Sequence, residues 1–357
     1  MRKASLFLLL LIYSNLYSQN LRTLDKDIVD ENNNEIILRS AGLGGWMLQE
    51  PYMFNYSSGA NTQHEFKAKL NNLVGNENTE LFFQSWLDNF VTEQDIDSIA
   101  SWGFNSIRLP MHYDLFTLSI QDEPVEGENT WLDRGFEIVD QLLDWCEQNE
   151  LYLILDLHAA PGGQGYDAAI SDYNSDFPSL WESVENQNKT IALWEQLAIR
   201  YKDEPWIGGY DLLNETNWDL ANFELRSFYV QVTNAIREHD SNHIIFIEGN
   251  WFANDFTGLI PPWDDNMVYS FHKYWSYNNT ESIQWVLDIR NQYNTPLWMG
   301  ESGENSNLWF TDAIRLFEDN EIGWAWWPWK KIESINSTLS ISSNSDFQSI
   351  INYFTDG

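Results

Sequence analysis

Two glutamates follow short apolar runs at matching positions of this chain. Glu215 comes after the run 209–213, and Glu301 comes after the run 297–299. Two carboxyl groups that face each other across a cleft can cleave a glycosidic bond: one protonates the leaving oxygen, and the other attacks the anomeric carbon or activates water. Either residue alone could be an ion-pair partner, but the pair favours acid–base chemistry.

Other polar residues end neighbouring apolar runs. They are Arg108, His158, Asn214, His272 and Tyr274, with Trp326 or Trp327 on the last run. Polar groups beside buried strands need partners, so their concentration indicates a site. We expect Arg108, helped by the Tyr274 hydroxyl, to keep Glu301 ionised. Asn214 could donate to a sugar hydroxyl, and the two histidines could bind hydroxyls, tune the acid or be structural.

Metal and serine chemistry fit the sequence poorly. It contains no HExxH motif, no His-x-His pair after the first run and a single cysteine, Cys146, so no thiolate set is available. Ser302 follows Glu301, but there is no G-x-S-x-G. We therefore expect no metal site and no serine nucleophile.

The elements that must position these residues alternate along the chain. Eight short apolar runs are expected to be strands that end near Trp46, Pro110, His158, Glu215, Gly249, His272, Glu301 and Trp327. Helical spacing is expected in 82–101, 131–148, 190–202, 223–238, 282–293 and 308–319. This alternation predicts an α/β fold, a (β/α)8 TIM barrel whose strand ends share one face. A doubly wound sheet is the alternative, but no Gly-rich phosphate loop follows any run.

Three further features complete the expected organisation. Residues 28–38, with Glu31 to Asn34 at their centre, predict a short β-hairpin before the barrel. The long spacing between Trp46 and Pro110 leaves room for an extra loop beside the cleft. Cys146 lies in a helical pattern and is expected to be buried.

The first residues are typical of a signal peptide. Arg2 and Lys3 precede an apolar stretch over 6–13, and small residues follow at Ser14 and Ser18. We expect residues 1–19 to be removed and residues 20–357 to form one catalytic domain. The expected product is secreted, extracellular or periplasmic, monomeric and without a membrane span.

The strongly acidic composition limits the kinds of molecule that this protein is expected to bind. The chain has 54 acidic and 19 basic residues, a net charge of −35. Such a surface repels phosphate backbones and anionic lipids, so nucleic-acid and membrane partners are not expected. The 19 tryptophans suit either a large core or the stacking of sugar rings.

Six ordered motifs resemble glycoside hydrolase family 5, the cellulase family. They are GFNSIRLP at 103–110, LDLHAAPGGQ at 155–164, LLNET at 212–216, FHKY at 271–274, MGESG at 299–303 and GWAWWPWK at 323–330. The resemblance implies a catalytic pair at Glu215 and Glu301, retention of configuration and no cofactor. It also implies that Arg108, His158, Asn214, His272, Tyr274 and Trp327 belong to the substrate site.

The substrate is narrowed by a second resemblance. LGGWMLQEPYM at 43–53 and HAAPGGQ resemble the exo-β-1,3-glucanase branch of the family, which implies that Glu50 lies in the substrate pocket. The expected partner is therefore a polysaccharide or oligosaccharide such as a β-1,3-glucan. An endo-acting β-1,4-glucanase or mannanase and a non-catalytic carbohydrate-binding protein on the same barrel are the alternatives.

Overall fold

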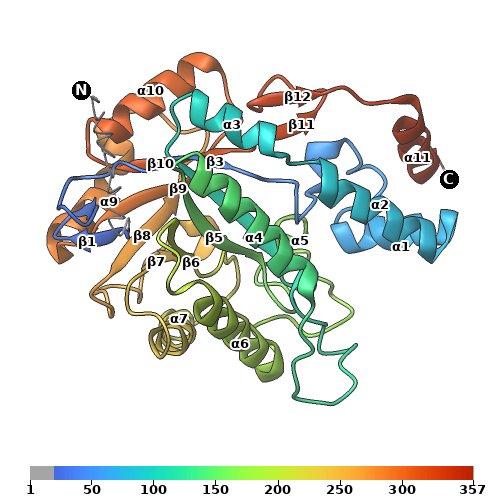
Figure 1. The fold of residues 1–357 in the computed structure, drawn as a ribbon, viewed down its shortest axis with the longest axis horizontal. Coiled ribbons are helices and arrows are strands. Elements are labelled where there is room, and N and C mark those ends of the chain that lie inside the picture. Colours follow the sequence, from blue (N-terminus) through green and yellow to red (C-terminus); the bar gives the residue numbers. More distant parts are fainter. Residues whose placement is uncertain (1–19, 357) are drawn as a thin grey trace, which may run out of the picture.

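The computed structural model describes residues 20–356, and its centre is a closed barrel of eight parallel strands (Figure 1). In barrel order the strands are β10 (Gly323–Trp327), β3 (Arg39–Gly42), β4 (Ser106–His112), β5 (Tyr152–Ala159), β6 (Ile207–Asp211), β7 (Ile244–Glu248), β8 (Met267–His272) and β9 (Leu297–Gly303). The predicted (β/α)8 barrel is thereby confirmed.

Burial on both faces explains why the strands appear in the sequence as continuous apolar runs. Every residue of β4 and of β5 is buried, as are the five residues of β7. Helices cover the outer face of this parallel sheet, and packed side chains fill its inner face. A polar residue can therefore be buried there at low cost only if it has hydrogen-bond or ion-pair partners. The polar residues within these strands are therefore the ones that need an explanation.

Amphipathic helices cover the outside of the barrel. They include α3 (Glu93–Ser101), α4 (Asp133–Gln148), α6 (Val184–Tyr201), α7 (Asn222–Arg237), α9 (Thr280–Tyr293) and α10 (Asn307–Glu318). In α4 the buried residues recur at three- and four-residue spacing, from Ile138 to Cys146. Side-chain caps begin several helices; the Ser183 hydroxyl, for example, accepts from the Asn186 amide at the start of α6.

Two of the expected strand ends were wrong. The first strand ends at Gly42 instead of near Trp46, and the fourth ends at Asp211 instead of near Glu215. In both places buried residues continue past the hydrogen-bonded ladder, so the apolar pattern outlasts the strand. Glu215 therefore lies in the loop after β6, where its φ of +34° is in the left-handed region.

The N-terminal hairpin exists but is shifted from its expected position. β1 (Arg22–Leu24) pairs antiparallel with β2 (Asp27–Val29), with the turn at Asp25 and Lys26. The expected turn, Glu31 to Asn34, only closes a single bridge between Val29 and Glu35. Asp25 has a φ of +55°, which marks a tight turn that the residue types did not reveal.

The segment expected as a loop after the first strand is largely helical. It contains η1 (Pro51–Phe54), α1 (Gln63–Val74) and α2 (Asn76–Asn89) before α3. The single helix expected over 82–101 is in fact α2 and α3, because Thr92 and Asp95 form a capping box that begins a new helix.

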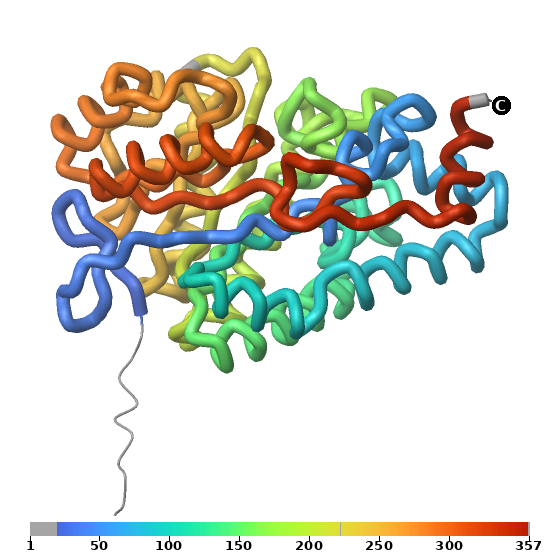
Figure 2. The backbone as a smooth tube through the Cα atoms, turned by 90° about the horizontal axis from the view of Figure 1, so that it is seen from above, coloured from blue at the N-terminus to red at the C-terminus, as the bar shows by residue number. Residues whose placement is uncertain are grey.

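The last helix, α11 (Ser345–Asp356), packs on this same segment. Figure 2 shows the red C-terminal helix beside the light-blue helices α1 and α2, far from the N-terminal hairpin. The ring centroids of Phe66 and Phe354 lie 5.6 Å apart, and the hydroxyls of Ser58 and Thr355 are 3.0 Å apart. Two short strands, β11 (Lys330–Ile332) and β12 (Leu339–Ile341), connect β10 to this helix.

The remaining expectations concern the termini and the cysteine. The expected signal peptide, residues 1–19, lies outside the described residues. Cys146 is fully buried in the core, and burial raises the pKa of its thiol. Among the described residues, no helix is long and apolar enough to cross a membrane.

Close packing at the end of β3 makes Gly44 a test of the fold. A Cβ atom at Gly44 would lie 2.6 Å from the Trp327 ring, which is stacked on His158 and cannot move freely. We expect Gly44→Ala to lower the free energy of unfolding by about 1–3 kcal/mol through overpacking. Denaturant titration of both proteins measures this difference, and an unchanged midpoint would show that Trp327 has room to shift.

Candidate active site

A cavity of about 550 Å³ lies at the carboxyl end of the barrel strands. Its walls bring together seven of the nine residues that the sequence singled out: Glu50, His158, Glu215, His272, Tyr274, Glu301 and Trp327. The other two, Arg108 and Asn214, are fully buried behind this wall. Parallel strands all end at one face of a barrel, which is why residues far apart in sequence meet here.

His272 connects the two glutamates. Its Nδ1 lies 2.6 Å from Glu215 Oε1 and 3.2 Å from Glu301 Oε2. One oxygen of each carboxyl and a ring nitrogen of His272 all lie within 4.8 Å of one another. The two carboxyl groups therefore face the same small volume of the cavity.

The surroundings shift the pKa values of the two glutamates in opposite directions. Burial raises the pKa of Glu215, and the bonded His272 opposes this only in part. Burial alone would also raise the pKa of Glu301, but His272 and Arg108 outweigh it, so the Glu301 pKa is lowered. A pair whose pKa values diverge in this way can hold one proton donor beside one ionised carboxylate.

Arg108 pairs with several carboxylates below the cavity. Its Nε donates to Asp211 at 3.1 Å, and its Nη2 donates to Glu248 at 2.8 Å. The expected contact with Glu301 is present, but it is the longest, at 3.4 Å. Asn214 accepts from Arg108 at 2.9 Å, so both residues hold the charged groups in place and do not line the cavity.

Glu248 is the most important residue that the sequence reasoning missed. It ends β7, is fully buried, and accepts the backbone N–H of Glu215 at 2.7 Å. It also lies 3.2 Å from Nε2 of His272. The signal was available, because Glu248 ends an apolar run just as Glu301 does.

His158, Glu50 and Trp327 form a second group. His158 contacts Asp156 at 2.7 Å and lies 3.7 Å from Glu50, and its ring stacks on Trp327 at 5.1 Å between centroids. Burial opposes the positive charge of His158, but Asp156 raises its pKa to about 10. Burial raises the pKa of Glu50 to about 7, and His158 counteracts this in part.

The aromatic residues of the last strands separate into wall and core. Trp327 lines the cavity and donates through Nε1 to the Tyr52 hydroxyl at 3.1 Å, whereas Trp326 packs on Phe310, 4.3 Å away. Tyr274 also lines the cavity. The hydrogen bond expected from its hydroxyl to Glu301 is absent from the described part of the chain, where Glu301 is bound by Arg108 and His272.

The rest of the wall comes from loops and short helices that follow the strands. It adds Tyr52, Asp167, Ala169, Ile170, Phe252, Asn254, Trp275 and Glu304. Lys331 holds Glu304 through an ion pair of 2.7 Å and lies 4.6 Å from the centre of the Tyr52 ring. Tyr52 lies within the motif at 43–53, and Trp275 and Glu304 directly follow the motifs at 271–274 and 299–303, but these residues were not predicted as part of the site.

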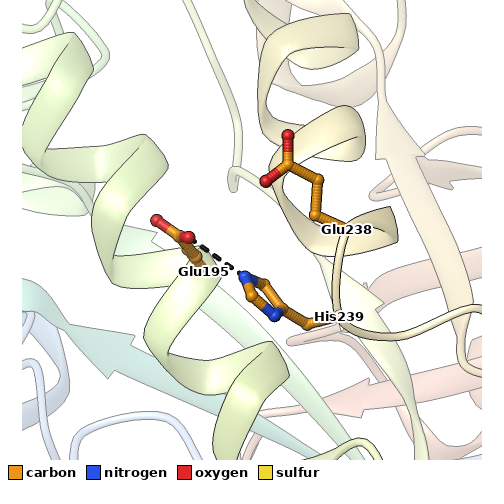
Figure 3. Close-up of side chains that lie close together, drawn as sticks. All are labelled: Glu195, Glu238 and His239. Carbon is orange, nitrogen blue, oxygen red and sulfur yellow. Dashed lines mark hydrogen bonds and ion pairs between the residues drawn. The ribbon is translucent and has the colours of Figure 1, made fainter.

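Three clusters of described residues bring possible metal ligands within 4.8 Å of one another: Glu195 with Glu238 and His239, Glu215 with His272 and Glu301, and Asp156 with Asp211 and Glu248. The first lies on the outer surface, where His239 pairs with Glu195 at 3.0 Å between α7 and α6 (Figure 3). In the third, the guanidinium of Arg108 already contacts all three carboxylates. The two buried clusters thus surround protein cations, which leaves their donor sets poorly suited to a metal ion.

Comparison with known proteins identifies the family. The family described as Cellulase (glycosyl hydrolase family 5) matches residues 60–333. A β-xylosidase of Phanerodontia chrysosporium is 39% identical over 69% of this chain, which spans about half (50%) of that protein. Endoglucanase C of Acetivibrio thermocellus is 27% identical over 75% of this chain and 92% of its own length.

Two further proteins share the fold or the sequence more distantly. A probable glucan 1,3-β-glucosidase A of Aspergillus clavatus is 26% identical over 70% of this chain and 58% of its own length. The structure of Cel5A of Thermotoga maritima in complex with cellobiose superposes with a TM-score of 0.61 at 17% identity, covering 88% of this chain and 97% of that one. The family resemblance seen in the motifs is confirmed: the chain belongs to the cellulase family, glycosyl hydrolase family 5, and is an O-glycosyl hydrolase.

Proposed function

We propose that this protein is a retaining β-glycosidase that cleaves β-glucans, with Glu215 as acid/base and Glu301 as nucleophile. The bridge made by His272 carries the proposal, because it holds oxygens of the two carboxyl groups within 4.8 Å. Retaining enzymes need carboxyl groups about 5–5.5 Å apart, whereas inverting enzymes leave about 6.5–9.5 Å for a water molecule.

The mechanism follows from the two protonation states. Glu215 gives its proton to the glycosidic oxygen while Glu301 attacks the anomeric carbon, so the glycosidic bond breaks and a glycosyl–enzyme ester forms. Glu215, now ionised, takes a proton from water, and the water oxygen displaces Glu301 from the sugar. The raised pKa of Glu215 and the lowered pKa of Glu301 suit these starting states.

The choice of a β-glucan rests on the cavity and on one relative. Glu50 stands in the cavity wall, as the resemblance to exo-β-1,3-glucanases implies, and a relative bears the name glucan 1,3-β-glucosidase. A second candidate substrate is a β-xyloside, favoured by the 39% identity to a β-xylosidase. The two sugars differ by one hydroxymethyl group, so the residues around that group decide between them.

We also propose that the enzyme acts outside the cytoplasm. The proposal rests on the basic, apolar and small-residue pattern of residues 1–19. We propose that it acts there as a monomer on a polysaccharide or oligosaccharide.

The nucleophile can be tested by Glu301→Gln. The amide cannot attack the anomeric carbon, so we expect turnover of any accepted glycoside to fall by at least about 1,000-fold. Glu195→Gln on the outer surface of α6 is the matched control and should keep its activity. Hydrolysis rates and thermal unfolding midpoints are measured together; a correctly folded Glu301→Gln enzyme with near-normal rates would contradict the assignment.

The acid/base can be tested by Glu215→Gln with two leaving groups. The wild-type rate should fall as pH rises through the raised pKa of Glu215, because the proton donor is then lost. In the variant, a dinitrophenyl glycoside needs no acid and should give a burst of dinitrophenol, whereas an alkyl glycoside should hardly react. Equal slowing of both substrates, with the alkaline limb kept, would exclude this role for Glu215.

The substrate can be tested by product analysis on laminarin-type β-1,3-glucan, soluble cellulose, mixed-linkage glucan, mannan and xylo-oligosaccharides. We expect glucose as the main product from β-1,3-glucan, because the cavity volume of about 550 Å³ suits a short end of a chain. Xylose as the main product would favour the second candidate. Ladders of oligosaccharides from cellulose or mannan would contradict release from chain ends.

A further inference from the structure

Glu248 lies beneath the cavity and contacts two residues of its lining, Glu215 and His272, from behind. It is fully buried and has no place in the wall. Its two oxygens are divided between two tasks: Oε2 accepts the backbone N–H of Glu215 at 2.7 Å, and Oε1 accepts from Arg108 at 2.8 Å and faces His272 Nε2 at 3.2 Å. Both the backbone of one catalytic carboxylate and the histidine between the pair therefore depend on this side chain.

The first task fixes an uncommon backbone. Glu215 has a φ of +34°, in the left-handed region that side chains other than glycine seldom adopt. Such a conformation costs on the order of 1–3 kcal/mol and persists only where its surroundings hold it. The hydrogen bond from the Glu215 amide to a buried carboxylate is charge-assisted and directly attached to the strained residue.

The second task sets the charge of His272. A neutral imidazole carries one N–H, yet here carboxylates face both ring nitrogens: Glu248 at Nε2, and Glu215 and Glu301 at Nδ1. Only the positively charged imidazolium is attracted by the carboxylates on both of its sides. Burial works against this charge, but Glu248 and Glu301 together hold the pKa of His272 well above its ordinary value.

We propose that Glu248 is a positioning residue of the reaction, which holds the Glu215 backbone in its left-handed conformation and keeps His272 positively charged between the two catalytic carboxylates. The inference rests on the proposed roles of Glu215 and Glu301. The charged and titratable groups that surround Glu248 are Arg108 from β4, Asp156 from β5, Asp211 from β6, Glu215 from the following loop, Tyr229 from α7 and His272 from β8. Glu301 from β9 faces it through Arg108 and His272.

The informative substitution is Glu248→Gln, which keeps the size and removes the charge. Either orientation of the amide sets its NH2 group against a donor, the Glu215 N–H or Arg108 Nη2. We expect His272 to lose its proton, which removes the positive charge beside both catalytic carboxylates and raises both pKa values. Because Glu301 must be ionised and Glu215 protonated, both limbs of the pH profile of kcat/KM should move to higher pH.

The kinetic signature separates positioning from substrate binding. We expect kcat to fall roughly 10- to 100-fold, by analogy with the loss of residues that orient the ligands of a metal site. KM should change little, because Glu248 does not line the cavity. Glu248→Asp keeps the charge but shortens the reach, so its pH profile should stay at the wild-type position although kcat falls.

Asp240→Asn is the matched control. Asp240 is a buried carboxylate just before the other end of β7; it contacts His243 at 2.6 Å and accepts the backbone N–H of His243 at 3.1 Å, remote from the cavity. This variant should lower the thermal unfolding midpoint and leave the pH profile unchanged. It shows what the loss of a buried carboxylate–histidine pair does by itself.

Imidazole ¹⁵N spectra give a readout that needs no activity, since the chain has only six histidines. We expect the His272 signal to be that of an imidazolium in the wild type and in Glu248→Asp, and that of a neutral ring in Glu248→Gln. If the wild type hydrolyses no glycoside, the proposed function fails, while the spectra still report on His272. A Glu248→Gln protein with a wild-type pH profile and a charged His272 would overturn the inference.

Discussion

The buried guanidinium of Arg108 is the interaction on which the rest of the site depends. It is fully buried and lies within 3.4 Å of carboxylate oxygens from four residues, Asp156, Asp211, Glu248 and Glu301. Isolated charges in a protein interior cost several kcal/mol each, so neither the cation nor these carboxylates could be buried here without the others. Closure of the barrel brings side chains of β4, β5, β6, β7 and β9 around this one guanidinium.

The carboxyl groups of this cluster have pKa values shifted in opposite directions. Burial and the neighbouring Glu248 raise the pKa of Asp211 well above its ordinary value, whereas His272 and Arg108 overcome burial and lower the pKa of Glu248 to about 2. The same balance of burial against cations separates the pKa values of Glu215 and Glu301. Two identical side chains thus acquire opposite pKa shifts from their surroundings.

Segments between the strands supply the rest of the cavity wall. Tyr52 comes from η1, Asp167 from the turn before α5 (Ala168–Ser171), and Phe252 from the left-handed turn of α8 (Asn250–Ala253). Barrel enzymes vary in specificity through such loops while the strand ends keep the chemistry.

The barrel, its strands and most of the polar residues at the strand ends could be predicted from the sequence. Burial on both faces leaves long apolar runs, so each polar residue next to them is conspicuous. Glu215, Glu301 and His272 could be found in this way. The turn at Asp25, the end of β6 before Glu215 and the wall residues were not predicted from the sequence. Local backbone conformation there depends on contacts with residues that are distant in the sequence. Two features became visible only in the folded protein: Arg108 and Asn214 lie behind the cavity, and Glu248 supports both Glu215 and His272. Side chains from different strands become neighbours only when the barrel closes.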